Sequence, residues 1–101
     1  MKNHERRFIT SLVCEEIKKE IEHSEEIHGL FHSLHEAIAK IREEYLELEE
    51  AIFWGVQKNQ NTDAVRSEAI QLAAMATKLA TMVSLIPDTS RSLFDTENDV
   101  T

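Results

Sequence analysis

The chain has 101 residues, a formal net charge of −8, and only two glycines and one proline. At this length one domain is expected, and the scarcity of turn residues favours an all-α helical bundle over a β protein. The negative charge and the lack of a basic patch disfavour binding to a nucleic acid polymer. No apolar run approaches the roughly 20 residues that span a bilayer, and Cys14 is the single cysteine, so we expect a cytoplasmic protein without membrane contact.

The first helix is predicted over residues 4–27. Apolar residues recur in this stretch at every fourth position: Ile9, Val13, Ile17 and Ile21. A row with this spacing drifts around the helix axis, which predicts an oblique crossing over a neighbouring helix. Cys14 lies beside the row, and we expect it to be a buried small side chain and not a nucleophile.

A short break separates the first helix from the second. Gly29 is expected to end the first helix in a left-handed conformation. Ser33 and Glu36 match a capping box, which predicts that the second helix starts near Leu34. Gly55 is expected to end it. The apolar residues of this helix follow alternating steps of four and three: Leu34, Ile38, Ile41, Tyr45, Leu48 and Ile52. Their stripe predicts the face that packs into the core.

The third helix is predicted from Ala64 to Ile86, with Thr62 or Asp63 as its N-cap and Pro87 as its stop. It carries one apolar stripe (Val65, Ala69, Leu72, Ala76, Leu79, Val83, Ile86) and a second apolar flank (Ile70, Ala73, Ala74, Met75, Met82). A helix that is apolar around most of its circumference is expected at the centre of a bundle, here completed as a homodimer or tetramer. Residues 1–87 are thus expected to form a single helical domain, and residues 88–101 a polar, flexible tail.

The stretch from Arg42 to Glu50 contains five glutamates in nine residues. On a helical projection Glu44 lies about 80° from the centre of the apolar stripe, at its border, and Glu47 projects in nearly the same direction. In the third helix, Glu68 and Gln71 repeat this spacing within an apolar segment. If the two helices are antiparallel, these four side chains converge. Their oxygen atoms are ligands that suit Mg²⁺ or Mn²⁺.

Three stretches of the sequence also follow the pattern of a known family: Phe31-His32-Ser33-Leu34-His35-Glu36, Glu43-Glu44-Tyr45-Leu46-Glu47, and the run from Ser67 to Ala76. Over residues 31–86 the chain resembles the MazG-like all-α nucleoside triphosphate pyrophosphohydrolases of a phage and bacterial branch. The family pattern is Glu-Glu-x-x-Glu, a spacer, and Glu-x-x-Asp. Gln71 stands where the best-known members have aspartate.

The resemblance implies a Mg²⁺-dependent enzyme that cleaves a nucleoside triphosphate to the monophosphate and pyrophosphate. By this resemblance Glu44, Glu47, Glu68 and Gln71 would hold the metal, with Mn²⁺ as a possible substitute, and Glu43 would be a catalytic base or a supporting residue. The alternative is a catalytically degenerate helical scaffold of the same fold, which Gln71 favours. The glutamates of the second helix can also be interpreted without a metal, as a solvated acidic helix face.

Overall fold

The computed structural model describes residues 2–57 and 62–86, with three helices and no strand in these ranges: α1 (Asn3–His28), α2 (Leu34–Gln57) and α3 (Asp63–Leu85). The all-helical prediction is therefore confirmed. None of these three helices has the length and apolar character that crossing a membrane requires. The predicted tail, residues 88–101, lies outside the described residues, as do residues 58–61 between α2 and α3.

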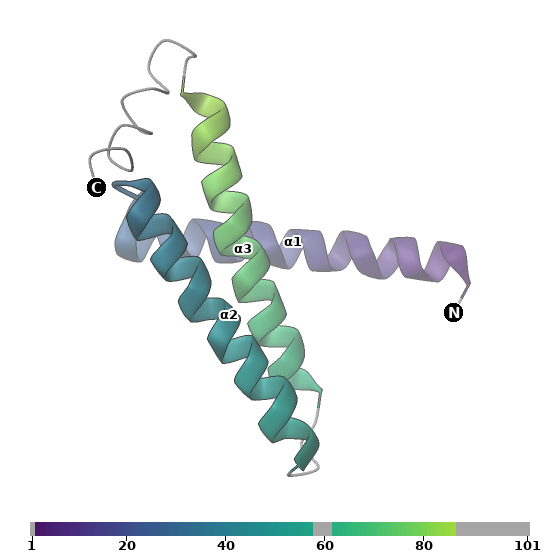
Figure 1. Cartoon of the computed structure of the whole chain (residues 1–101). Helices are drawn as coiled ribbons and strands as arrows, with labels where there is room; N and C mark the ends of the chain where they lie inside the picture. The colour runs from purple at the N-terminus through teal and green to yellow at the C-terminus, as the bar shows by residue number, and fades with distance from the viewer. Residues whose placement is uncertain (1, 58–61, 87–101) are drawn as a thin grey trace.

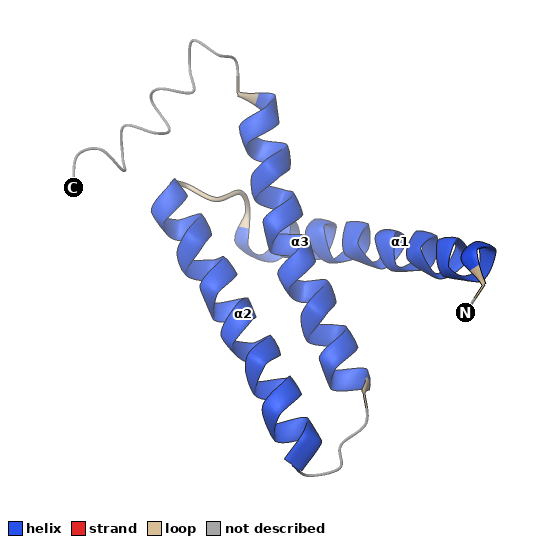
Figure 2. Cartoon of the chain, turned by 45° about the vertical axis from the view of Figure 1, so that its right-hand side comes forward, coloured by secondary structure: helices blue, strands red, loops and turns tan. Residues whose placement is uncertain are grey.

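Helices α2 and α3 lie side by side and antiparallel, and α1 crosses α3 with its N-terminal half extending away from the pair (Figures 1 and 2). Helix α3 packs against both of the others. The core gathers around Phe31, Ala37, Ala74 and Met75, with Ile17 and Ile21 of α1 among the partly buried residues packed against it. The oblique crossing and the central place of the third helix were both expected from the apolar patterns.

Local signals at the turn between α1 and α2 act in part as predicted. Gly29 ends α1 with a φ of 71°, which favours glycine, but its ψ of −159° is outside the left-handed helical conformation that was predicted. The Ser33 Oγ accepts a hydrogen bond from the Glu36 backbone N–H at 3.1 Å. The Glu36 carboxylate, however, accepts from the His32 backbone N–H at 3.3 Å and lies 3.1 Å from His32 Nδ1, so it binds the residue before the cap. Gly55 is a helical residue, because α2 continues two residues beyond the predicted end.

The predicted stripe of α2 is buried only in part: Ile41 packs against the core, and Leu34 and Leu48 are partly buried. Ala37 is fully buried and Glu44 is 5% exposed, whereas Ile38 and Tyr45 are each half exposed. The Tyr45 hydroxyl donates to Glu49 Oε2 at 3.2 Å instead of lining the core. The helix is thus rotated about its axis relative to the stripe, because α3 packs against the side that carries Ala37 and Glu44.

Helix α3 shows the same kind of shift. Its buried residues are Ile70, Ala74, Met75 and Lys78, so the second apolar flank is the more deeply buried one, while Leu79 of the longer stripe also packs against the core. Cys14 is exposed, which corrects the expectation of a buried thiol. Both differences follow from the position of α1, which crosses α3 with only the C-terminal part of its apolar row in contact with the core.

Candidate metal centre

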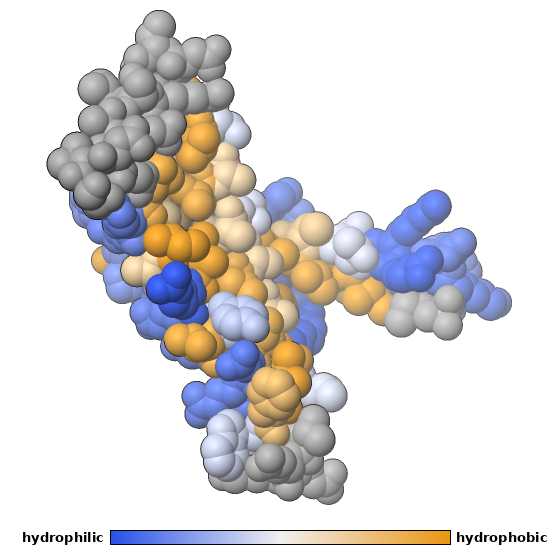
Figure 3. Space-filling model, in the orientation of Figure 1, coloured by the Kyte–Doolittle hydropathy of each residue, from blue (hydrophilic) through white to orange (hydrophobic). Residues whose placement is uncertain are grey.

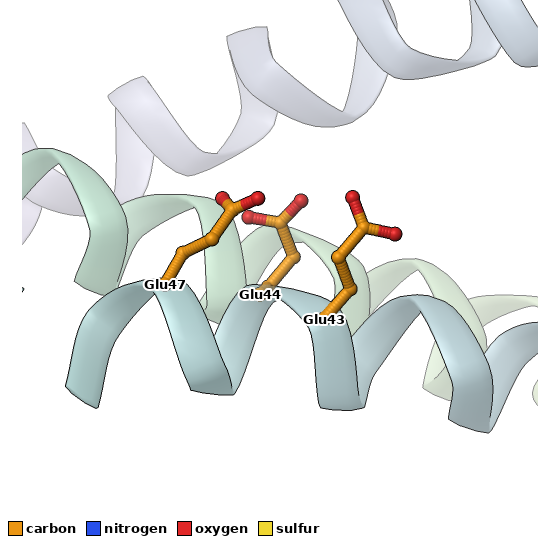
Figure 4. Close-up of side chains that lie close together, drawn as sticks. All are labelled: Glu43, Glu44 and Glu47. Carbon is orange, nitrogen blue, oxygen red and sulfur yellow. The ribbon is translucent and has the colours of Figure 1, made fainter. Parts of the chain in front are cut away.

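Three glutamates of α2 form one cluster, which we call the acidic cluster: Glu43, Glu44 and Glu47. One carboxylate oxygen from each lies within 4.8 Å of the others. Spacings of one, three and four residues along a helix place these side chains on one side of it, and all three extend toward the side on which α1 passes (Figure 4). Like charges this close repel one another, so the cluster favours a cation.

Glu44 is the buried member of the acidic cluster, and Lys40 is its partner. The Lys40 Nζ lies 3.2 Å from Glu44 Oε1 and 3.6 Å from Glu43 Oε1. Burial raises the pKa of Glu44, the Lys40 hydrogen bond opposes that rise, and the charges of the neighbouring glutamates add to it. Burial lowers the pKa of Lys40, but the two carboxylates together raise it above its ordinary value. A single lysine therefore only partly compensates the cluster.

Glu47 connects the acidic cluster to α3 through Glu68. Burial raises the pKa of Glu47, and both the charge of Glu68 and a side-chain hydrogen bond with it raise it further. The Glu68 Oε2 is buried and has no hydrogen-bond partner among the described residues. A buried carboxylate oxygen without a donor is costly. A divalent cation between these two carboxylates would remove both the repulsion and the unsatisfied oxygen.

Gln71 lies one turn beyond Glu68 on α3 and is half buried. It lines a cavity of about 260 Å³ together with Glu44, Lys40 and residues of α1. The predicted pair on α2 (Glu44, Glu47) and the predicted pair on α3 (Glu68, Gln71) thus face the same region of the molecule. Glu47 interacts with Glu68, and Glu44 and Gln71 line one cavity. Among the described residues, the carboxylates that lie within 4.8 Å of one another are those of Glu43, Glu44 and Glu47, and Glu68 is not part of this group.

Two charged residues of this region were missed by sequence reasoning. Lys40 precedes Glu43 and Glu44 by three and four positions, a spacing that predicts helix ion pairs and could have identified it. Lys78 is 2% exposed, and its Nζ donates to Ser24 Oγ at 3.0 Å and to the Gly29 carbonyl at 2.7 Å. No spacing rule joins Lys78 to α1, because the two meet only through the crossing of α1 and α3.

The donor set fits a hard divalent cation. Carboxylate and amide oxygens are the ligands that Mg²⁺ and Mn²⁺ prefer, whereas the described part of the acidic region supplies no thiolate or imidazole to the cluster. The buried Glu68 Oε2 is an acceptor that such an ion would satisfy.

Comparisons with known proteins add no further constraint. No family model matches the sequence, and neither the curated proteins nor the solved structures give a match.

Proposed function

We propose that this chain is a Mg²⁺-dependent nucleotide pyrophosphohydrolase of the MazG-like all-α type, which cleaves a nucleoside triphosphate to the monophosphate and pyrophosphate. The single observation that carries the proposal is the buried, partnerless Glu68 Oε2 beside Glu47 at the edge of the acidic cluster. A solvated acidic helix face needs no buried carboxylate on a second helix. The motif resemblance over residues 31–86 supplies the reaction type.

In this proposal Glu44, Glu47 and Glu68 hold the divalent cation, and Gln71 supports them with its amide oxygen. The bound cation would supply positive charge to the phosphate oxygens of a substrate that the acidic protein would otherwise repel. Glu43 is more exposed than Glu44, and its side chain is 59% accessible. Its carboxylate can therefore accept a proton from a water molecule that attacks the phosphoric anhydride.

The assembly in this proposal is a homodimer or tetramer. Phe8, Ile9 and Leu12 are exposed on the extending half of α1, at 65, 46 and 49%. Apolar residues reach the surface along α3 and part of the way along α1 (Figure 3). Exposed apolar surface of this kind is typical of a protein–protein interface. Light scattering at micromolar concentration should give a mass above one chain, and a stable monomer would contradict this part of the proposal.

The catalytic proposal is tested by calorimetric titration with Mg²⁺ and Mn²⁺, followed by assays of pyrophosphate release from a panel of nucleoside triphosphates. Glu47→Gln and Glu68→Gln should each reduce the rate by about 100-fold or more, as expected when a group that stabilises transition-state charge is lost. Glu50→Gln is the matched control, because Glu50 is an exposed glutamate of the same helix outside the acidic cluster. Metal binding that both site variants leave unchanged would exclude the enzyme.

A non-catalytic scaffold of the same fold is the second candidate. Gln71 favours it, because a neutral amide is a poorer ligand than the aspartate of the family pattern. The exposed apolar face of α1 would then serve assembly alone. The same titration separates the two candidates, since a scaffold would bind neither cation with the participation of Glu47 and Glu68.

A further inference from the structure

Two cavities with shared lining residues lie between α1 and the α2–α3 pair, and together we call them the hollow. Its near part, about 260 Å³, is lined by Glu44 among others. Its far part, about 170 Å³, reaches Phe31 and Lys78. Lys40 and Met75 line both parts. Each part alone is smaller than the roughly 300–1,000 Å³ of common ligand pockets, and together they reach this range.

The far part of the hollow combines apolar walls with fixed polar groups. Phe31 and Met75 are 7% and 2% exposed. The Lys78 Nζ lies 4.6 Å from the centroid of the Phe31 ring, and its hydrogen bonds to Ser24 and Gly29 fix its position. A mostly apolar pocket with a few oriented polar groups is the usual composition of a small-molecule site.

Ser24 supplies a hydroxyl whose proton lacks a good acceptor. Its Oγ accepts from Lys78, so its own proton points elsewhere. Within residues 2–57 and 62–86, this proton has the Met75 sulfur at 4.0 Å as its acceptor, and a thioether sulfur is a weak acceptor. Ser24 is 8% exposed and lines both parts of the hollow. Buried hydroxyl groups normally have a hydrogen-bond partner, so this proton is available to a ligand oxygen.

Ser24, Lys40 and Lys78 bring donor groups to the far part, and the Glu36 carboxylate and the His28 ring also line it. Lys78 already donates to Ser24 and Gly29, and Lys40 is paired with Glu44, so the Ser24 hydroxyl is the donor that lacks a good acceptor. The two carboxylate oxygens of Glu36 already interact with the backbone N–H and the ring of His32. A ligand edge that carries carbonyl oxygens matches this wall better than one that carries amino groups, because the amino protons would face other donors.

We propose that the far part of the hollow binds the base of a nucleotide and selects oxo bases, such as guanine, hypoxanthine and uracil, over the amino bases adenine and cytosine. The inference rests on the proposed function, which places the phosphates of the same nucleotide at the acidic cluster. The apolar faces of the base lie against Phe31 and Met75. The carbonyl oxygen at its edge accepts from the Ser24 hydroxyl.

Two matched nucleoside pairs test this selection: inosine against adenosine, and uridine against cytidine. Within each pair a carbonyl oxygen is replaced by an amino group, and no phosphate is present, so no metal is required. Titration up to about 10 mM, followed by amide NMR shifts, covers millimolar dissociation constants. The oxo member should bind about fivefold more tightly, which is the effect of one net hydrogen bond. Shifts should concentrate at Ser24, Gly29, Phe31 and Met75.

Ser24→Ala should remove the preference within each pair. Ser84→Ala should retain it, because Ser84 Oγ donates to the Ala80 carbonyl at 2.7 Å, away from the hollow. Thermal unfolding of both variants verifies that they fold. Equal binding of the paired nucleosides, shifts outside the hollow, or no shifts at all would overturn the inference. Metal titration of the same samples tests the proposed enzyme independently, because nucleoside binding does not depend on the acidic cluster. If the enzyme proposal is wrong, the metal does not bind, whereas the nucleoside preference can still be observed.

Discussion

Glu44 and Lys78 both carry a charge into the interior, at 5% and 2% exposure, but their surroundings differ. Lys78 donates to two neutral oxygen acceptors and lies over an aromatic ring. Glu44 has one lysine partner and stands among like charges that raise its pKa beyond the effect of burial. Burial lowers the pKa of Lys78, and the charges of Glu25 and Glu36 oppose that fall. The comparison thus separates a buried charge held by fixed hydrogen-bond acceptors from one that stands among like charges and favours an added cation.

The largest expected effect is the loss of the Lys78 contacts. Lys78→Met should lower the free energy of unfolding by about 2–4 kcal/mol, because the buried Ser24 hydroxyl and the partly buried Gly29 carbonyl lose their donor at about 1–3 kcal/mol each. Thermal unfolding should show a fall in Tm of about 10 °C or more. The control is Lys19→Met, at an exposed lysine of α1. A Tm within a degree or two of the unsubstituted protein would show that the Lys78 contacts are not structural.

The acidic cluster should respond to a cation instead. Mg²⁺ at ten times its dissociation constant should raise the free energy of unfolding by about 1.4 kcal/mol, through binding to the folded state alone. Glu68→Gln should lose this stabilisation and Glu50→Gln should keep it. Thermal unfolding with and without Mg²⁺ measures the difference. Equal stabilisation of both variants would place the cation elsewhere on the molecule.

Lys40 should act as a competitor of the cation. Its Nζ occupies Glu44 Oε1, so a metal ion that binds there displaces it. Lys40→Met should therefore tighten Mn²⁺ binding by about fivefold, which corresponds to one modest ion pair of roughly 1 kcal/mol. Calorimetric titration provides the affinity. Weaker Mn²⁺ binding in this variant would mean that Lys40 organises the carboxylates for the ion and does not compete with it.

The smallest expected effect is a pH dependence of the metal-free protein. The folded-state pKa values of Glu44 and Glu47 are raised above 4.5, so the folded state holds more protons above that pH. Their contribution to stability is therefore present at low pH and is lost as pH rises through the folded pKa values. The pKa values of Glu16 and Glu36 are lowered, so their contribution to stability has the opposite pH dependence. It is present above pH 4.5 and is lost as the pH falls below that value.

Urea unfolding in a chelator at about pH 5 and about pH 7 measures this dependence. Glu44→Gln should flatten it and should raise stability at the higher pH by a few tenths of a kcal/mol, since each like-charged helix pair costs about 0.2–0.5 kcal/mol. A steeper pH dependence in this variant would contradict the assignment to Glu44.

The helices and the turn between α1 and α2 were predictable because they depend on interactions between residues close in sequence. Gly29 with its positive φ and the hydrogen bond to Ser33 Oγ each depend on a few neighbouring residues. The end of α2 was misplaced by two residues, because glycine is tolerated within a helix and does not compel a stop. The prediction that carboxylates of the second and third helices converge rests on a short connection, which makes two successive helices antiparallel neighbours, and the electrostatic interaction of Glu47 with Glu68 agrees with it.

The sequence by itself determined that the described residues are helical and where the helices begin, and it predicted that carboxylates of α2 and α3 converge. Only the tertiary structure decided which side of each helix is buried. It moved Glu44 from the border of a stripe into the interior, left Ile38 and Tyr45 half exposed, and joined Lys78 to α1. The reason is physical: periodicity fixes directions within one helix, whereas the crossing of α1 over α3 fixes which of those directions meets a neighbour.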